Sequence, residues 1–178
     1  LMSELFGHEP FWVVALKAGL IFVILVLYTL FNIWFERKVV ARMQHRIGPN
    51  VHGPFGLLQS LADGVKLAFK EDLFPAAADK VVYVLAPIIA TIPAFMAWAV
   101  IPFADGWVLA NINVGLLYLL AVSSLGVYGI IIAGWASNSK YPFFSAMRAA
   151  AQMVSYEVSI GFVLIPVVLW AGSFNLSA

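Results

Sequence analysis

The stretch AGLIFVILVLYTLFNIWF, residues Ala18–Phe35, runs for eighteen residues without a charge. With residues 11–17 in front, it exceeds the roughly 20 residues that a helix needs to cross the hydrocarbon core of a bilayer. Similar charge-poor segments follow at 81–104, 114–136 and 149–171. Because lipid offers no hydrogen-bond partner to the backbone, each segment is expected to be a helix. The sequence thus predicts an all-α polytopic membrane protein with about four transmembrane helices, in a single membrane domain over residues 1–178.

The composition supports this prediction and excludes several other classes of protein. Of 178 residues, 63% are hydrophobic and only 11% are charged, which is more apolar surface than a soluble domain could hide. The net charge of +1 leaves no large basic face for nucleic acid. The chain has no cysteine, and its three histidines lack a metal-ligand spacing, so no metal site is expected. It also lacks the glycine-rich motifs that bind nucleotide phosphates.

The loops between the predicted spans differ in basic charge. The 36–80 loop carries seven Lys and Arg residues, the loop after residue 104 carries none, and the 137–148 loop carries two. Positively charged loops remain on the cytoplasmic side of a membrane. We therefore expect loops 36–80 and 137–148 to be cytoplasmic and the N-terminus to lie on the opposite side.

The 36–80 loop contains a predicted amphipathic helix at 57–70. Its polar residues Gln59, Asp63, Lys66 and Lys70 follow one another at spacings of four, three and four, which places them on one face. Two interpretations are open. The polar face either meets water and lipid headgroups, or it floors a cavity that holds a headgroup or a substrate.

The fourth predicted span contains a single acid, Glu157. Arg148 lies nine residues earlier, about 13 Å along a helix. A carboxylate at that depth costs a few kcal/mol, so Glu157 is expected to face the bundle interior or a wet cavity. It is interpreted either as part of a proton relay or as a structural acid held by a neighbouring polar group.

The third predicted span carries small residues on one face, a pattern typical of close helix packing. These residues are Ser123, Gly126, Gly129, Ala133 and Ala136. We expect this face to pack against another helix of the bundle.

Several longer motifs stand in a characteristic order. They read ERK at 36–38, RIGPNV at 46–51, GPFGLLQ at 53–59, ADGVKLAFKE at 62–71, GWASNSKY at 134–141, RAAAQMVSYEV at 148–158 and GSFNL at 172–176. In these motifs the sequence closely resembles the H-subunit family of bacterial respiratory complex I, which is subunit 1 of NADH:quinone oxidoreductase in mitochondria. Members of that family are longer, so the sequence is expected to be an N-terminal portion.

The resemblance implies a membrane subunit of a proton-pumping NADH:quinone oxidoreductase. It implies quinone as the substrate, FMN and iron–sulfur clusters bound by partner subunits, and no catalytic residue in this chain. The expected partners are subunits of the peripheral and membrane arms, quinone and the lipid bilayer. The expected location is the bacterial plasma membrane, or the mitochondrial inner membrane in a eukaryote.

The resemblance also implies roles for eight charged residues. Those that match the quinone chamber are Arg37, Asp63, Arg46 and Lys66. Those that match the proton path are Glu157, Glu36, Glu71 and Arg148.

Three other functions remain open. The chain could be the equivalent subunit of a related enzyme complex such as a membrane-bound hydrogenase, which shares the patterned first loop and the intramembrane acid. It could be a transporter that uses Glu157, although no inverted repeat is visible. A purely structural bundle subunit would leave both the long patterned loop and the acid without a use.

Overall fold

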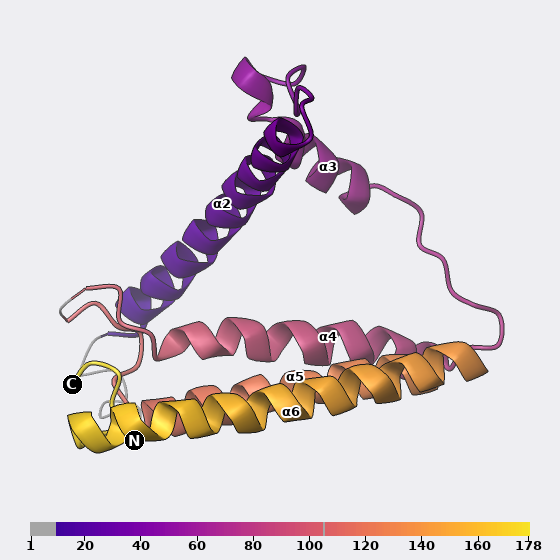
Figure 1. Cartoon of the computed structure of the whole chain (residues 1–178). Helices are drawn as coiled ribbons and strands as arrows, with labels where there is room; N and C mark the ends of the chain where they lie inside the picture. Colours follow the sequence, from indigo (N-terminus) through magenta and orange to yellow (C-terminus); the bar gives the residue numbers. More distant parts are fainter. Residues whose placement is uncertain (1–9, 105) are drawn as a thin grey trace. The chain divides into compact units, whose positions relative to one another are not determined.

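The computed structural model describes residues 10–104 and 106–178, in which every long element is an α-helix (Figure 1). The elements are α2 (Phe11–Met43), the 3-10 turn η1 (Pro54–Gly56), α3 (Gln59–Ala68), α4 (Lys80–Met96), the 3-10 turn η2 (Ala97–Ala99), α5 (Gly115–Ala136) and α6 (Lys140–Ala171). Four of the described helices, counting α4 with η2, are long and apolar enough to cross a membrane. The prediction of an all-α polytopic membrane protein is thereby confirmed.

Two helices extend beyond the predicted spans. Helix α2 continues to Met43 instead of ending near Phe35, and α6 begins at Lys140 instead of residue 149. The reason is that charged residues end an apolar run but not a helix, since Glu, Arg and Lys are good helix formers. The loops predicted at 36–80 and 137–148 are therefore shorter. Residues 36–43 belong to α2, and residues 140–148 belong to α6.

The other predicted ends differ less. Helix α5 begins at Gly115, one residue after the predicted start of the third span. The second span is helical only to Ala99 rather than to residue 104, because Pro102 lacks the backbone N–H that a continuing helix needs. Helix α3 is a turn shorter than the predicted 57–70.

The chain forms two compact units. One comprises residues 19–73, with most of α2 and all of α3. The other comprises residues 74–178 together with the described residues before Gly19.

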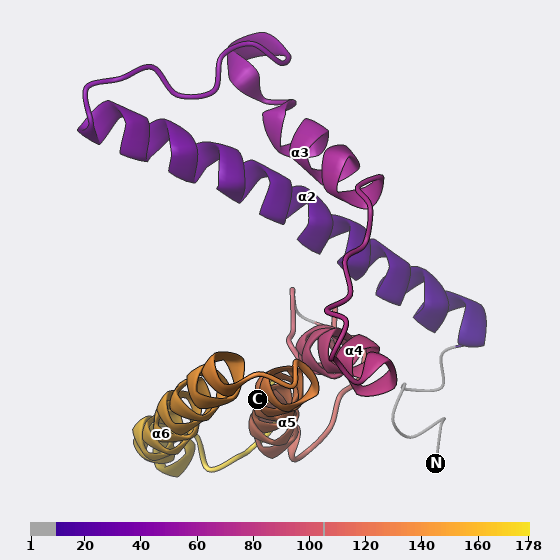
Figure 2. The same cartoon turned by 90° about the vertical axis from the view of Figure 1, so that its right-hand side faces the viewer.

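Helices α4, α5 and α6 form a three-helix bundle, in which α5 packs against both neighbours (Figures 1 and 2). Two glycines of α5 make the close approach possible. A Cβ at Gly129 would lie 2.9 Å from Cβ of Ala90 in α4, and one at Gly134 would lie 2.2 Å from Cβ of Ala146 in α6. The core of the bundle thus consists of small side chains at close backbone distances, as in many membrane bundles.

The predicted small-residue face is confirmed only in part. Gly129 and Ala136 are buried, whereas Ser123 and Ala133 are exposed. Gly134, which lies off the predicted face, is buried against α6. A single face could not describe α5, because the helix has two neighbours.

Hydrogen bonds tie the ends of the bundle together. At one end, the Asp79 amide donates to the Ala136 carbonyl (3.0 Å), and Nδ2 of Asn138 donates to the Ala77 carbonyl (3.0 Å). At the other end, Nδ2 of Asn175 donates to Oδ1 of Asn111 (2.8 Å). These polar contacts lie at the ends of the bundle, where water can compete with them. The apolar centres of the helices therefore depend on packing.

The substitution Gly134→Ala tests the packing of α5 on α6. The new methyl group would clash with Ala146 and with the Pro142 carbonyl, 2.8 Å away. We expect it to lower the free energy of unfolding by about 1–3 kcal/mol, the usual cost of overpacking. Loss of helical circular dichroism during an SDS titration measures this change.

Gly126→Ala is the matched control, because no atom outside its own helix backbone lies within 4 Å of the added Cβ. Alanine favours a helix over glycine, so this variant should be neutral or up to about 1 kcal/mol more stable. Equal unfolding of both variants would contradict the close α5–α6 packing.

Candidate functional site

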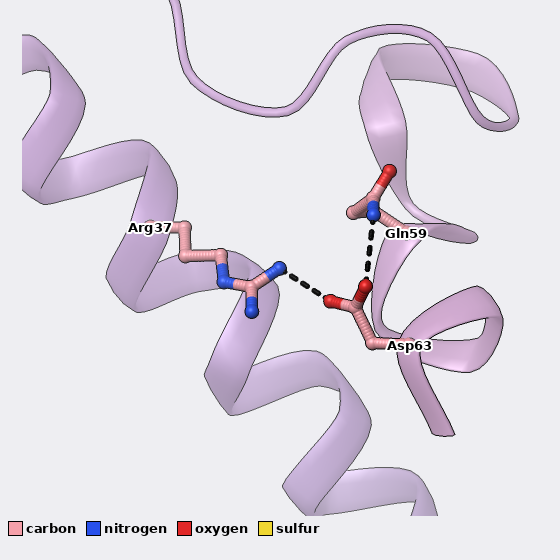
Figure 3. Close-up of polar contacts among 3 residues, drawn as sticks. All are labelled: Arg37, Gln59 and Asp63. Atoms are coloured by element: carbon pink, nitrogen blue, oxygen red, sulfur yellow. Dashed lines mark hydrogen bonds and ion pairs between the residues drawn. The ribbon is translucent and has the colours of Figure 1, made fainter. Parts of the chain in front are cut away.

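An ion pair between α2 and α3 brings together two of the predicted site residues, Arg37 and Asp63 (Figure 3). Nη1 of Arg37 donates to Oδ2 of Asp63 at 2.6 Å. Nε2 of Gln59, one turn earlier in α3, donates to Oδ1 of Asp63 at 3.1 Å. Both carboxylate oxygens of Asp63 therefore accept a hydrogen bond from a defined donor.

The turn before α3 returns the chain to α2 and so makes this pair possible. Gly56 has φ +77°, and a Cβ there would lie 2.1 Å from the Pro49 carbonyl oxygen. Only glycine fits this close approach of two backbone segments. Nε1 of Trp34 in α2 also donates to the Phe55 carbonyl at 3.0 Å, which anchors the turn to the helix.

The environment of Asp63 favours its charged form. The hydrogen bond from Arg37 is the main cause of a lowered pKa, partly opposed by desolvation and aided by Gln59 and by the charges of Arg37 and Lys66. At neutral pH the site therefore presents a carboxylate beside a guanidinium. The two side chains are 47% and 36% exposed, so water and salt screen their attraction.

The other predicted chamber and path residues near this pair are less constrained. Lys66 lies on α3 one turn after Asp63 and is exposed, and Glu36 is exposed on α2. Nε of Arg46 donates to Oε1 of Gln44 at 2.9 Å, a local contact within the turn. Glu71 is exposed after the end of α3. These four residues do not contribute to the hydrogen-bonded cluster of Arg37, Gln59 and Asp63.

Glu157 and Arg148 lie in the other compact unit, on α6. Glu157 is partly buried, and Arg148 is exposed. Among residues 10–104 and 106–178, no side chain forms a hydrogen bond or an ion pair with Glu157. The alternative in which a neighbouring polar group holds Glu157 thus finds no such group in the described part of this chain.

Sequence reasoning missed two residues of the site. The spacing places Gln59 on the polar face of 57–70, and its separation of four residues from Asp63 is the signal that identifies it as a partner. Trp34 gave no signal, because its hydrogen bond goes to a backbone carbonyl 21 positions away.

The described residues contain no group of three or more His, Asp or Glu side chains that could hold a metal ion. The cluster offers an anion on the amphipathic helix α3, paired with a cation on α2. Such a pair can accept hydrogen bonds from a polar headgroup and donate hydrogen bonds to it. A charge that develops nearby changes the electrostatic potential at the pair.

Comparison with known proteins gives one consistent result. The NADH dehydrogenase family matches residues 16–178. The H subunit of NADH-quinone oxidoreductase from Erythrobacter litoralis is 61% identical over an alignment of 183 positions, which spans 99% of this chain and 53% of that protein. The proteins of the same name from Caulobacter vibrioides and Rickettsia typhi are 61% and 59% identical, over 93% and 99% of this chain and 47% and 52% of theirs. The chain spans about half the length of the curated relatives it matches.

Replacing Arg37 by glutamine should raise the pKa of Asp63 toward or above its ordinary value of 3.8. In the folded wild-type protein the lowered pKa keeps Asp63 ionised, so the stabilisation by the pair is complete above pH 3.8 and is lost as the pH falls further. Carboxyl carbon NMR of aspartate-labelled protein measures the titration, with Asp63→Asn to assign the signal.

Lys66→Gln removes the same charge from the same neighbourhood but no hydrogen bond to Asp63. Its charge is the smallest cause of the lowered pKa, so its effect should be clearly smaller than that of Arg37→Gln. An unchanged Asp63 titration in Arg37→Gln would show that the ion pair does not form in solution.

Proposed function

The chain belongs to the NADH dehydrogenase family, and we propose that it is part of the quinone-site membrane subunit of a proton-pumping NADH:quinone oxidoreductase. In this proposal the chain acts as one part of a multisubunit translocase and binds neither NADH nor a redox centre. NADH, FMN and the iron–sulfur clusters are bound by partner subunits of the peripheral arm. Further partners belong to the membrane arm.

The observation that carries the proposal is the cluster of Arg37, Gln59 and Asp63. It joins an apolar helix long enough to span a membrane to an amphipathic helix that follows it. A quinone has an apolar tail and a polar head, so its chamber needs this combination of lipid access and fixed hydrogen-bonding groups. Arg37 and Asp63 line the proposed chamber, with Arg46 and Lys66 contributing positive charge around it.

Reduction of a quinone places electrons, and a demand for protons, in a confined space. A fixed guanidinium favours the negative charge that develops on the quinone oxygens, as long as the distance is short. A nearby carboxylate responds by holding its proton more tightly, and in a low dielectric this response is larger than in water. In this way the redox chemistry biases the protonation of the acids around it.

The proton path is proposed to include Glu157, Glu36, Glu71 and Arg148. Glu157 supports the proposal because it is the single acid of a transmembrane helix and has no polar partner among the described residues. Ionisable groups in such positions mark ion and proton routes in many membrane proteins. The proposed membrane is the bacterial plasma membrane or its mitochondrial equivalent, with the segments 36–80 and 137–148 on the cytoplasmic or matrix side.

Asp63→Asn should lower NADH:quinone reductase activity about tenfold or more, while the complex still assembles. The variant keeps the shape of the side chain but removes the charge that fixes the Arg37 guanidinium in position. A loss of about 1.4 kcal/mol of transition-state stabilisation is tenfold in rate. The assay uses membranes that carry the full-length subunit, with assembly checked by native gel.

Asp72→Asn is the matched control, because Asp72 is an exposed acid after α3 that takes no part in the cluster. It should retain wild-type activity. Wild-type activity in the Asp63→Asn variant as well would remove the proposed chamber role of Asp63.

Glu157→Gln should reduce proton translocation about tenfold, because the amide cannot exchange a proton. Ser159→Ala is its control, since the Ser159 hydroxyl donates only to the Ser155 carbonyl within α6. Acidification of the lumen of inverted membrane vesicles, per quinone reduced, compares the two. Equal proton translocation in both variants would make Glu157 a structural acid.

A further inference from the structure

A groove runs along α2, and none of the residues proposed for the quinone chamber or the proton path lines it. Its volume is about 410 Å³. The lining residues all lie in the compact unit of α2 and α3, and they are Phe31, Trp34, Phe35, Lys38, Val39, Arg42 and Phe55. The floor is apolar and four of its seven residues are aromatic, whereas two residues on one side are basic.

The aromatic part of the groove is held in place by specific contacts. The rings of Phe31 and Phe35 stack at 6.0 Å between centroids, and Phe31 also meets Trp34 at 5.8 Å. The hydrogen bond from Trp34 to the Phe55 carbonyl fixes the opposite wall. These contacts hold the aromatic residues of the groove in a defined arrangement.

Phe55 adopts a strained backbone to form that wall. Its φ of +56° lies in the left-handed region, which costs a residue with a side chain about 1 kcal/mol or more. Phe55 nevertheless remains 75% exposed, so the strain gains little burial within this chain. Strained residues of this kind cluster where a ligand is held.

The two basic residues have no acidic partner within the described part of the chain. Lys38 and Arg42 are one helical turn apart and share the groove. Arg37, their neighbour, differs in that it is neutralised by Asp63. The groove therefore carries two uncompensated positive charges next to its aromatic part.

The heights of these groups match the layers of a bilayer. The apolar run of α2 ends at Phe35, and Lys38 and Arg42 follow about 5 Å and 10 Å further along the helix. The headgroup layer beyond the hydrocarbon is about 5–8 Å thick on each side. Helical side chains lean toward the helix N-terminus, which here brings the Arg42 guanidinium back toward that layer.

We propose that this groove binds an anionic phospholipid. The lipid phosphate lies between Lys38 and Arg42, and an acyl chain follows the aromatic part of the groove past Phe31 and Phe35. A neutral quinone head would leave both cations without a counter-charge, whereas a phosphate diester supplies one. The site is separate from the proposed quinone chamber and does not depend on it.

The test is photolabelling of the assembled complex with the full-length subunit, in nanodiscs of zwitterionic phosphatidylcholine. A phosphatidylglycerol with a diazirine on its acyl chain is the probe, and mass spectrometry locates the label. Residues 31–55 should be labelled. Lys38→Gln with Arg42→Gln should reduce this labelling about 25-fold below saturation, since each cation contributes about fivefold near an anionic headgroup.

Two further variants separate the site from the general effect of charge. Lys70→Gln with Lys80→Gln removes the same charge outside the groove and should leave the label at 31–55 unchanged. Lys38→Arg with Arg42→Lys keeps both charges and should retain it. Loss of label in the Lys70 and Lys80 variant to the same extent would overturn the proposal.

The wild-type complex alone also decides the question, even if a variant fails to assemble. Equal labelling of residues 31–55 by a photoreactive phosphatidylcholine would overturn recognition of an anionic headgroup. Displacement of the phosphatidylglycerol probe by an excess of short-chain quinone would assign the groove to the quinone. Absence of label at 31–55 would also overturn the proposal, because it would show that another chain, or the rest of this subunit, covers the groove.

Discussion

Hydrocarbon offers no hydrogen-bond partner to a peptide group, and this constraint shapes nearly every element of the chain. It explains why the long apolar runs are helices, since only a helix satisfies its own backbone within a single segment. It also explains the small core of the bundle. Where lipid and side chains are equally apolar, helices associate through close packing, which Gly129 and Gly134 permit on two sides of α5.

The same constraint makes each polar group in or near the membrane informative. Asp63 is held by Arg37 and Gln59 at the surface of an amphipathic helix, so its charge is compensated and its position defined. Glu157 shows the opposite arrangement, with partial burial and no polar partner in the described chain. An acid with fixed partners suits the binding of a headgroup, whereas an acid without them suits the transfer of a proton, and the proposed division of roles rests on this contrast.

Much of the fold could be predicted from apolar periodicity, because the length of a transmembrane run is a strong signal. The start of α5 was predicted to within one residue. Helix α2 continues beyond its predicted span and α6 begins before its own, because charge marks the edge of the lipid and not the end of a helix. The additional turns of α2, residues 36–43, hold Arg37, Lys38 and Arg42, so the helix beyond the apolar run carries its polar chemistry.

The site was less accessible to sequence reasoning. The spacing within 57–70 indicates a polar face, but nothing in it states which distant residue that face meets. Arg37 and Asp63 were linked only through a family resemblance, and the structure gives the link a physical form in a 2.6 Å ion pair. The turn that brings them together depends on Gly56, whose left-handed backbone and contact with Pro49 are tertiary features.

The proposed quinone chamber is tested most directly by a quinone with a photoreactive headgroup, applied to the active complex with the full-length subunit. If Asp63 lines the chamber, a label forms within α3, close to Asp63, and excess unlabelled quinone removes it. A label confined to partner subunits, in a complex that still reduces quinone, would contradict it.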